Sequence, residues 1–385
     1  MKYFIITFGC QMNKSDSERI ATVLEKDGYQ PASKETGADL VVVNMCSVRQ
    51  SAVDRVYGLF PKFKKLREKN PKLKTILTGC ILKKDRTKFT EGFDQILKFK
   101  DLLKYQPKYQ YKPIAYIPIS NGCNNFCSYC VVPFVRGPLV CRDHQEILEE
   151  VKDIIKNGFK EIWLLGQNVN DYQSPTDSSI TEPRRGEGGD EGKLRRRQTS
   201  SITRAPAKGG DEGKLRRRQT SSINFAKLLK MVDDISGDFK ILFTSPHPMN
   251  FSEELINTLS ESEKFGKYLN LPVQSGDNKI LKKMNRNYNV EEYKNLVKKI
   301  REKIPGIKLS TDVIVGFPGE TKKQFQNTVK LFKEIKFDNA YIAKYSPRPG
   351  TAAFKMKDDI PLKEKKRREK TLRKIIERMI ERPES

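Results

Sequence analysis

Three cysteines in one short stretch are the residues of this sequence most clearly suited to chemistry. In "SNGCNNFCSYCVVPFVRG", Cys123, Cys127 and Cys130 follow the spacing C-x3-C-x2-C. Structural zinc sites take four ligands, and a cubane iron–sulfur cluster has four irons to ligate. Three thiolates on four irons leave one iron open, and an open metal position is typical of a catalytic site.

An open iron suits a small chelating molecule with amino and carboxylate groups. S-adenosylmethionine has both groups, and an electron from the cluster can break its sulfur–carbon bond to yield a reactive radical. The alternative is a zinc site, which would need Cys141 or His144 as its fourth ligand, an irregular spacing for zinc.

Three further cysteines each end an apolar, strand-like run. "YFIITFGC" ends at Cys10, "ADLVVVNMC" at Cys46 and "KTILTGC" at Cys80, with helix-like segments between the runs. Short β-rich runs separated by helices predict a parallel sheet, whose strands all end along one edge. We therefore expect the three cysteines to converge. The alternative is three unrelated buried cysteines, since free cysteine is often buried.

The elements that position these residues predict two α/β domains. Residues 1–105 fit an N-terminal three-layer parallel-sheet domain. Residues 112–355 contain six strand candidates with crossovers, from "YKPIAYIPIS" to "NAYIAKYSPRPG". An eight-fold barrel would need more strands, so a partial (β/α)6 barrel of the TIM type fits better.

Two segments stand outside this alternation. Residues 175–223 contain the repeat "GGDEGKLRRRQTSSI" twice, at 188–202 and 209–223, with no apolar periodicity. They are predicted to form a disordered insertion within the barrel. Residues 360–385 form a basic amphipathic helix that either packs on the barrel or approaches RNA, and packing is the favoured prediction.

Composition narrows the class of protein. The chain has 385 residues and a net charge of +26, which indicates either a lysine-rich solvated surface or a polyanionic partner such as RNA. Seven cysteines without an export signal argue against a disulfide framework. No apolar run is long enough to span a membrane, so a cytoplasmic location is expected.

Longer motifs add a family resemblance. "TFGCQMNKSDSE", "NMCSVRQSAV" and "TGC" accompany the C-x3-C-x2-C stretch, and "LLGQNVNDY", "LPVQSGDNKILKKMNRNY", "STDVIVGFPGET" and "YSPRPGTAA" follow it. Together they resemble the radical SAM methylthiotransferase family over residues 1 to about 375, apart from the insertion. "LLGQNVN" most resembles the MiaB group, the tRNA 2-methylthio-N6-dimethylallyladenosine synthases.

The resemblance implies two 4Fe–4S clusters, S-adenosyl-L-methionine and a tRNA substrate. The radical SAM cluster would be held by Cys123, Cys127 and Cys130, and an auxiliary cluster by Cys10, Cys46 and Cys80. The implied reaction adds a methylthio group to ring carbon two of N6-dimethylallyladenosine beside the anticodon. Three further side chains are predicted to contact S-adenosylmethionine or the substrate: Gln167, Asn168 and Asp312.

The remaining expectations concern binding partners, single arginines and alternative functions. The resemblance implies an electron donor such as a flavodoxin or ferredoxin, no membrane and a monomer, and the family's small C-terminal RNA-binding β-barrel is expected to be absent. Single arginines such as Arg136 and Arg286 are expected in surface salt bridges, although either could face phosphate. Rival readings are a methylthiotransferase for threonylcarbamoyl-adenosine in tRNA or for a ribosomal-protein aspartate, and a non-catalytic iron–sulfur RNA-binding protein.

Overall fold

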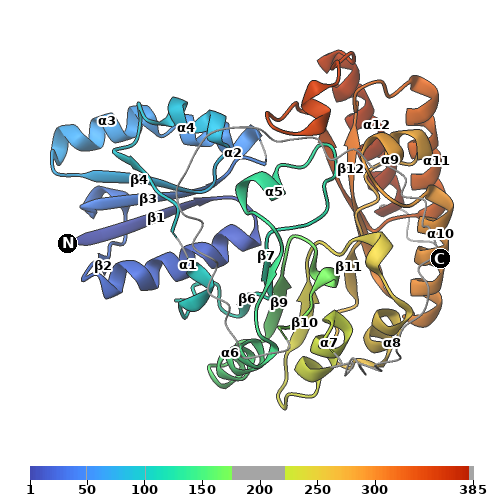
Figure 1. Cartoon of the computed structure of the whole chain (residues 1–385), viewed down its shortest axis with the longest axis horizontal. Coiled ribbons are helices and arrows are strands. Elements are labelled where there is room, and N and C mark those ends of the chain that lie inside the picture. The colour runs from blue at the N-terminus through green and yellow to red at the C-terminus, as the bar shows by residue number, and fades with distance from the viewer. Residues whose placement is uncertain (49, 100, 176–221, 381–385) are drawn as a thin grey trace, which may run out of the picture.

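The computed structural model describes residues 1–48, 50–99, 101–175 and 222–380 (Figure 1). The predicted repeat insertion therefore lies almost wholly outside the described residues. The described residues on the two sides of this gap are hydrogen-bonded to one another: the Ser174 amide donates to the Ile223 carbonyl at 2.9 Å. None of the described helices combines the length and apolar character needed to cross a membrane.

The N-terminal domain contains a five-stranded sheet in which every pairing is parallel. Its spatial order is β2-β1-β3-β4-β5. All residues of the central strand β3 are buried, as expected for a strand covered on both faces. The strands are β1 (Lys2–Phe8), β2 (Gln30–Pro31), β3 (Leu40–Cys46), β4 (Lys74–Cys80) and β5 (Gln95–Ile96).

Helices cover both faces of this sheet, which gives the predicted three layers. On one face α1 (Gln11–Lys26) packs Ile20 and Leu24 against Leu40 and Val42. The opposite face packs against α2 (Gln50–Tyr57), α3 (Phe60–Lys69) and α4 (Lys83–Phe89). Between the runs that end at Cys46 and Cys80 the sequence predicts helix, and the structure has two helices there before β4, α2 and α3. The chain divides there because Pro61 fits only the first turn of a new helix.

Six parallel strands form the second domain, as predicted for a partial barrel. They follow one another in space in chain order, as two three-stranded ladders joined by a parallel bridge between Ile241 and Phe265. The strands are β6 (Ile114–Pro118), β9 (Glu161–Leu165), β10 (Lys240–Phe243), β11 (Tyr268–Asn270), β12 (Lys308–Val315) and β13 (Asn339–Lys344).

Most of the crossover helices begin at a side chain that caps the free amides of the first turn. The Asp, Asn, Ser or Thr side chain before each of these helices accepts a bond from a backbone N–H. They are α6 (His144–Lys156), α7 (Phe225–Asp233), α8 (Glu253–Glu261), α9 (Asn278–Lys283), α10 (Val290–Lys303) and α11 (Lys322–Ile335). The short helix α9 was not predicted.

Smaller elements complete the barrel. β7 (Ser120–Asn121) and β8 (Val140–Cys141) pair antiparallel around the short helix α5 (Val132–Val135). The C-terminal helix α12 (Leu362–Ile380) packs on the barrel, as favoured above, and buries Leu372 and Ile376 in the main core.

Helix α1 also docks the N-terminal domain onto the barrel. The Ser15 hydroxyl donates to the Tyr116 carbonyl on β6 at 2.9 Å. Arg19 forms an ion pair with Glu150 of α6 at 2.8 Å, and Arg142 reaches the same carboxylate at 2.6 Å. All three charged side chains are at most 8 % exposed, so the interface encloses a buried ionic cluster. This contact fixes the cysteines of the N-terminal sheet relative to the barrel.

Candidate functional site

The three cysteines at the strand ends of the N-terminal sheet come together at one edge. Cys46 and Cys80 are direct partners in the β3–β4 ladder, and both side chains are buried. Cys10 lies two residues beyond β1 and begins α1. Phe8, the last residue of β1, pairs with Met45, so Cys10 follows β1 at the edge where Cys46 ends β3. The three cysteines therefore lie at the same edge of the sheet, as predicted.

A buried amide network holds the start of α1, and with it Cys10. The Asn13 Oδ1 atom accepts from the backbone amide of Cys10 at 3.3 Å and from its thiol at 3.5 Å. The Asn13 amide donates to Asn44 Oδ1 on β3 at 3.1 Å, and Asn44 donates back to the Asn13 carbonyl at 2.8 Å. Because both asparagines are fully buried, this reciprocal pair rigidly links Cys10 to the strand that carries Cys46.

The C-x3-C-x2-C loop leaves the end of β6 and is anchored on several sides. Gly122 adopts φ +83°, and a Cβ there would lie 2.0 Å from the Pro138 carbonyl oxygen, so only glycine fits. The Ser128 hydroxyl donates to the Lys283 carbonyl at 2.8 Å, and its own carbonyl accepts from the Ala353 amide at 2.7 Å. The loop is thereby tied to segments that follow β11 and β13.

Helix α5 joins the two groups of cysteines. It begins two residues after Cys130 and lies between the N-terminal sheet and the barrel (Figure 1). Val131 and Val135 share one buried apolar cluster with Cys46 and Cys80. Residues that follow the C-x3-C-x2-C loop therefore contact the cysteines at the ends of β3 and β4.

Each trio is accompanied by an arginine, and both arginines correct the expectation of surface salt bridges. Arg136 donates from Nε to the Cys80 sulfur at 3.1 Å. Arg286 is 8 % exposed and donates from Nη1 to the Cys127 sulfur at 3.5 Å. Sequence reasoning missed both contacts, because a lone arginine carries no signal of a sulfur partner that is distant in the chain.

The pKa values around the trios follow from burial and these guanidinium groups. Hydrogen bonding with Cys80, burial and the nearby Cys10 raise the pKa of Cys46. The bond from Cys46 and the charge of Arg136 lower the pKa of Cys80 to about 7, despite burial. Burial raises the pKa of Cys130 to about 12 and also raises that of Cys123. Cys80 is thus the cysteine of its pair that more readily becomes a thiolate.

The three side chains predicted to contact S-adenosylmethionine or the substrate lie in different surroundings. Gln167, two residues beyond β9, accepts from the Gly122 amide at 2.5 Å and so supports the loop just before Cys123. Asn168 is buried and donates to Asp171 at 2.7 Å, while its buried Oδ1 has no hydrogen-bond partner among the residues that the structure describes. Asp312 lies in β12 and accepts from Asn270 at 2.7 Å.

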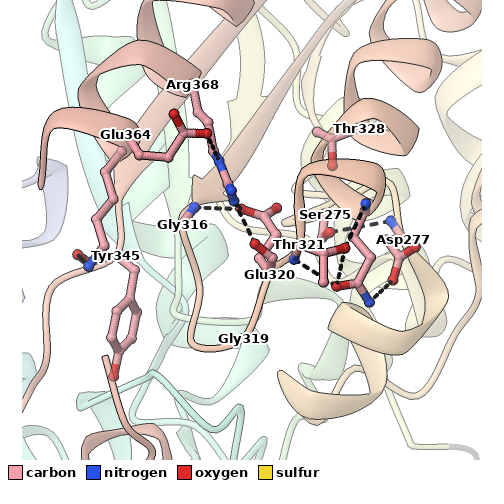
Figure 2. Close-up of polar contacts among 12 residues, drawn as sticks. Ser275, Asp277, Gly316, Gly319, Glu320, Thr321, Thr328, Tyr345, Glu364 and Arg368 are labelled. Atoms are coloured by element: carbon pink, nitrogen blue, oxygen red, sulfur yellow. Dashed lines mark hydrogen bonds and ion pairs between the residues drawn. The ribbon is translucent and has the colours of Figure 1, made fainter. Parts of the chain in front are cut away.

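The turn after β12 is held in place by α12. Figure 2 shows Glu320 and Arg368 pointing toward one another, with a 2.6 Å ion pair between side chains that are 1 % and 3 % exposed. The same carboxylate accepts from the Gly316 amide at 2.7 Å, and Arg368 also donates to the Glu320 carbonyl at 2.9 Å. The C-terminal helix therefore fixes the shape of the "GFPGE" turn at residues 316–320.

The zinc alternative does not fit this arrangement. The Cys141 sulfur accepts from the Gln173 amide at 3.4 Å, and the His144 ring pairs with the Ser174 hydroxyl at 2.9 Å. Among the described residues, no three Cys, His, Asp or Glu side chains are grouped closely enough to hold a single metal ion. Thiolates that bind different irons of a cubane need not converge on one point, so two open trios of soft sulfur donors suit iron–sulfur clusters instead.

Comparisons with known proteins agree with this fold. Residues 117–332 match the model of the radical SAM superfamily, and residues 2–98 match uncharacterized protein family UPF0004. The radical S-adenosylmethionine methyltransferase TsrM from Kitasatospora setae aligns with a TM-score of 0.55 at 13% identity, over 91% of this chain and 76% of that one. The cobalamin-dependent radical enzyme OxsB aligns with a TM-score of 0.54, over 98% of this chain and 56% of that one. The chain is thus a radical SAM enzyme.

Curated relatives define the family more narrowly. The tRNA-2-methylthio-N(6)-dimethylallyladenosine synthase of Clostridium novyi is 37% identical over 94% of this chain and 77% of its own length. The synthase of Clostridium tetani is 34% identical over 98% of this chain and 82% of its own. The chain belongs to the tRNA-2-methylthio-N(6)-dimethylallyladenosine synthase family, whose cofactors are S-adenosyl-L-methionine and 4Fe–4S clusters.

Proposed function

We propose that this chain is a tRNA methylthiotransferase that adds a methylthio group to ring carbon two of N6-dimethylallyladenosine next to the anticodon. The names of its relatives support this substrate. The observation that supports the proposal is the contact between strand-end cysteines of the N-terminal sheet and the residues after the C-x3-C-x2-C loop, because the reaction needs a radical source and a sulfur source near one another. Cys46 and Cys80 adjoin Val131 and Val135, which directly follow the C-x3-C-x2-C loop.

Each trio is assigned one cluster. Cys123, Cys127 and Cys130 would hold the radical SAM cluster, and Cys10, Cys46 and Cys80 the auxiliary cluster. When bound, the first supplies one-electron cleavage of S-adenosylmethionine, and the second supplies the sulfur that is methylated and transferred.

The chain's own residues provide position and shielding. The Asn13–Asn44 pair fixes Cys10 against β3, and the Gln167 side chain fixes the backbone that enters the C-x3-C-x2-C loop. Val131 and Val135 keep water from the space beside Cys46 and Cys80, which protects radical chemistry from quenching.

Features around the C-x3-C-x2-C loop suit RNA. Phe126 lies inside the loop and is 63% exposed, while Phe134 in α5 is 57% exposed. Proteins that read single-stranded RNA loops stack unpaired bases on exposed aromatic rings of this kind. The net charge of +26 supplies attraction to phosphate. Further parts of the proposal are a monomeric, cytoplasmic enzyme and a small electron donor such as a flavodoxin or ferredoxin.

Nucleoside analysis tests this function. The full chain is reconstituted anaerobically with iron and sulfide, then incubated with S-adenosylmethionine, a reductant and tRNA that carries N6-dimethylallyladenosine. Mass spectrometry of the digested tRNA should show the methylthio product, and Cys127→Ala should abolish it. Methylthiolation of threonylcarbamoyl-adenosine instead would assign the chain to the related group, and intact binding without product would indicate a non-catalytic RNA-binding protein.

A further inference from the structure

Arg136 donates hydrogen bonds to three acceptors that come from three segments of the chain. Its Nε donates to the Cys80 sulfur at 3.1 Å, its Nη1 to Asn121 Oδ1 at 2.9 Å and its Nη2 to Asp16 Oδ2 at 2.7 Å. The arginine and Asp16 side chains are 11% and 12% exposed. Such a planar fork, satisfied on three sides, permits little movement of the guanidinium.

These contacts link the two cysteine trios through one side chain. Asn121 lies two residues before Cys123, and Arg136 itself lies six residues after Cys130. Cys80 and Asp16 belong to the N-terminal domain, at the end of β4 and in α1. The guanidinium therefore holds the C-x3-C-x2-C loop and the edge of the N-terminal sheet in one fixed relation.

The Nε–H group of Arg136 donates to a sulfur atom although the same side chain already has a carboxylate partner. Asp16 already neutralises the arginine, and together with Cys80 it holds the pKa of Arg136 above its usual value in spite of burial. Its Nε–H group is directed at sulfur, which is a weak acceptor as a thiol and a much better one as a thiolate.

We propose that Arg136 is a positioning residue for the auxiliary cluster: its Nε–H···S bond to Cys80 raises the reduction potential of that cluster and fixes the cluster relative to the radical SAM loop. The proposal rests on the ligand assignment made under the proposed function. Hydrogen bonds and positive charge at a ligating sulfur stabilise the reduced, more negative cluster, and such supporting contacts also orient the ligand.

The test isolates the auxiliary cluster in the full-length chain. Cys123→Ala, Cys127→Ala and Cys130→Ala are combined as the parent, so that any remaining cluster belongs to the other trio. Arg136→Lys is added to this parent, because lysine keeps the charge but cannot form the three-sided fork. The matched control is Arg373→Lys, at a 53% exposed arginine of α12. Iron content and a redox titration followed by electron paramagnetic resonance are measured after anaerobic reconstitution.

Arg136→Lys is expected to keep its iron while the ratio of reduced to oxidised cluster at a fixed potential falls on the order of tenfold, which is a shift of about 59 mV for a one-electron couple. The control should match the parent. An unchanged potential in Arg136→Lys would overturn the proposal.

If Arg136→Lys fails to retain iron, Asn121→Ala provides the second variant, since it removes one neutral anchor of the guanidinium and leaves the sulfur contact and every charge in place. A smaller shift of the same sign supports the proposal, and no shift overturns it. Loss of all iron in the parent itself would refute the ligand assignment, and with it this inference. Normal iron and potentials in a chain without methylthio product would instead refute only the proposed function.

Discussion

The ionic cluster between α1 and α6 gives the sharpest test of how the two domains are held together. Glu150 accepts from the Tyr109 hydroxyl and pairs with Arg19 and Arg142, and its side chain is 3% exposed. Replacing it by alanine would leave Arg19 without its carboxylate and Arg142 with only the exposed Glu146 carboxylate. Breaking a buried ion pair by removing one partner costs about 3–5 kcal/mol.

The Glu150→Ala variant should therefore loosen the interface selectively. A loss of this size increases the population of the opened interface at least about a hundredfold, since about 1.4 kcal/mol corresponds to a factor of ten. Hydrogen–deuterium exchange followed by mass spectrometry should show faster exchange of the α1 amides, while the amides of β12 change little. Product formation should fall as well, because α1 positions Cys10 relative to the barrel.

The same helix offers a matched control. Glu146 is 65% exposed and lies 3.9 Å from Arg142, so Glu146→Ala removes a carboxylate from the same arginine at the surface. Its effect should stay within about 0.5 kcal/mol. If Glu150→Ala exchanges no faster in α1 than Glu146→Ala, the buried cluster does not hold the domains together and the reasoning is refuted.

Three further predictions concern other parts of the chain. Burial raises the pKa of Glu18 from 4.5 to about 7, so the folded state retains a proton that the unfolded state loses. The free energy of unfolding should therefore fall as the pH rises from about 4.5 to about 7. Glu18→Gln should thus stabilise the chain by about 2–3 kcal/mol at pH 8 and little at pH 5 in urea titrations, and an equal effect at both pH values would contradict this. Arg368→Ala should lower the free energy of unfolding by about 3–5 kcal/mol, because it leaves the buried Glu320 carboxylate without its ion-pair partner. Arg373→Ala on the same helix should lower it by less than about 1 kcal/mol. Similar melting temperatures for the two variants would show that the Glu320–Arg368 ion pair does not hold α12 on the turn. Phe126→Ala should weaken tRNA binding by about 1–3 kcal/mol without loss of iron, and unchanged affinity in a filter-binding titration would remove this ring from the RNA interface.

The helices and strands could be predicted from the sequence wherever the local pattern of apolar and polar residues reflects which side chains are buried. The runs that end at Cys46 and Cys80 are strands β3 and β4 with the expected ends, because strands inside a covered parallel sheet are mostly apolar along their length. The order of strands in the barrel followed in the same way. The division of α2 from α3 was signalled only by Pro61, and the short helix α9 lacks enough length for a periodic pattern.

The polar contacts of the site could not be predicted from the sequence, because the two residues of each contact are distant in the chain. Arg136 and Cys80 are 56 positions apart, and Arg19 and Glu150 are 131 apart. A lone arginine gives no local indication that it will be buried, since the cost of burying its charge is offset by a partner that only the tertiary fold supplies. The convergence of Cys10 with Cys46 and Cys80 was predictable only because parallel strands share one edge.

The central claim is that this chain holds two open iron–sulfur clusters on separate cysteine trios, and counting iron tests it most directly. The wild-type chain, reconstituted anaerobically, should bind about eight irons. The triple alanine variant of Cys123, Cys127 and Cys130 should bind about four, and so should the triple alanine variant of Cys10, Cys46 and Cys80. If removing either trio leaves the iron content unchanged, or if the wild-type chain binds about four irons in total, the account of two clusters is wrong.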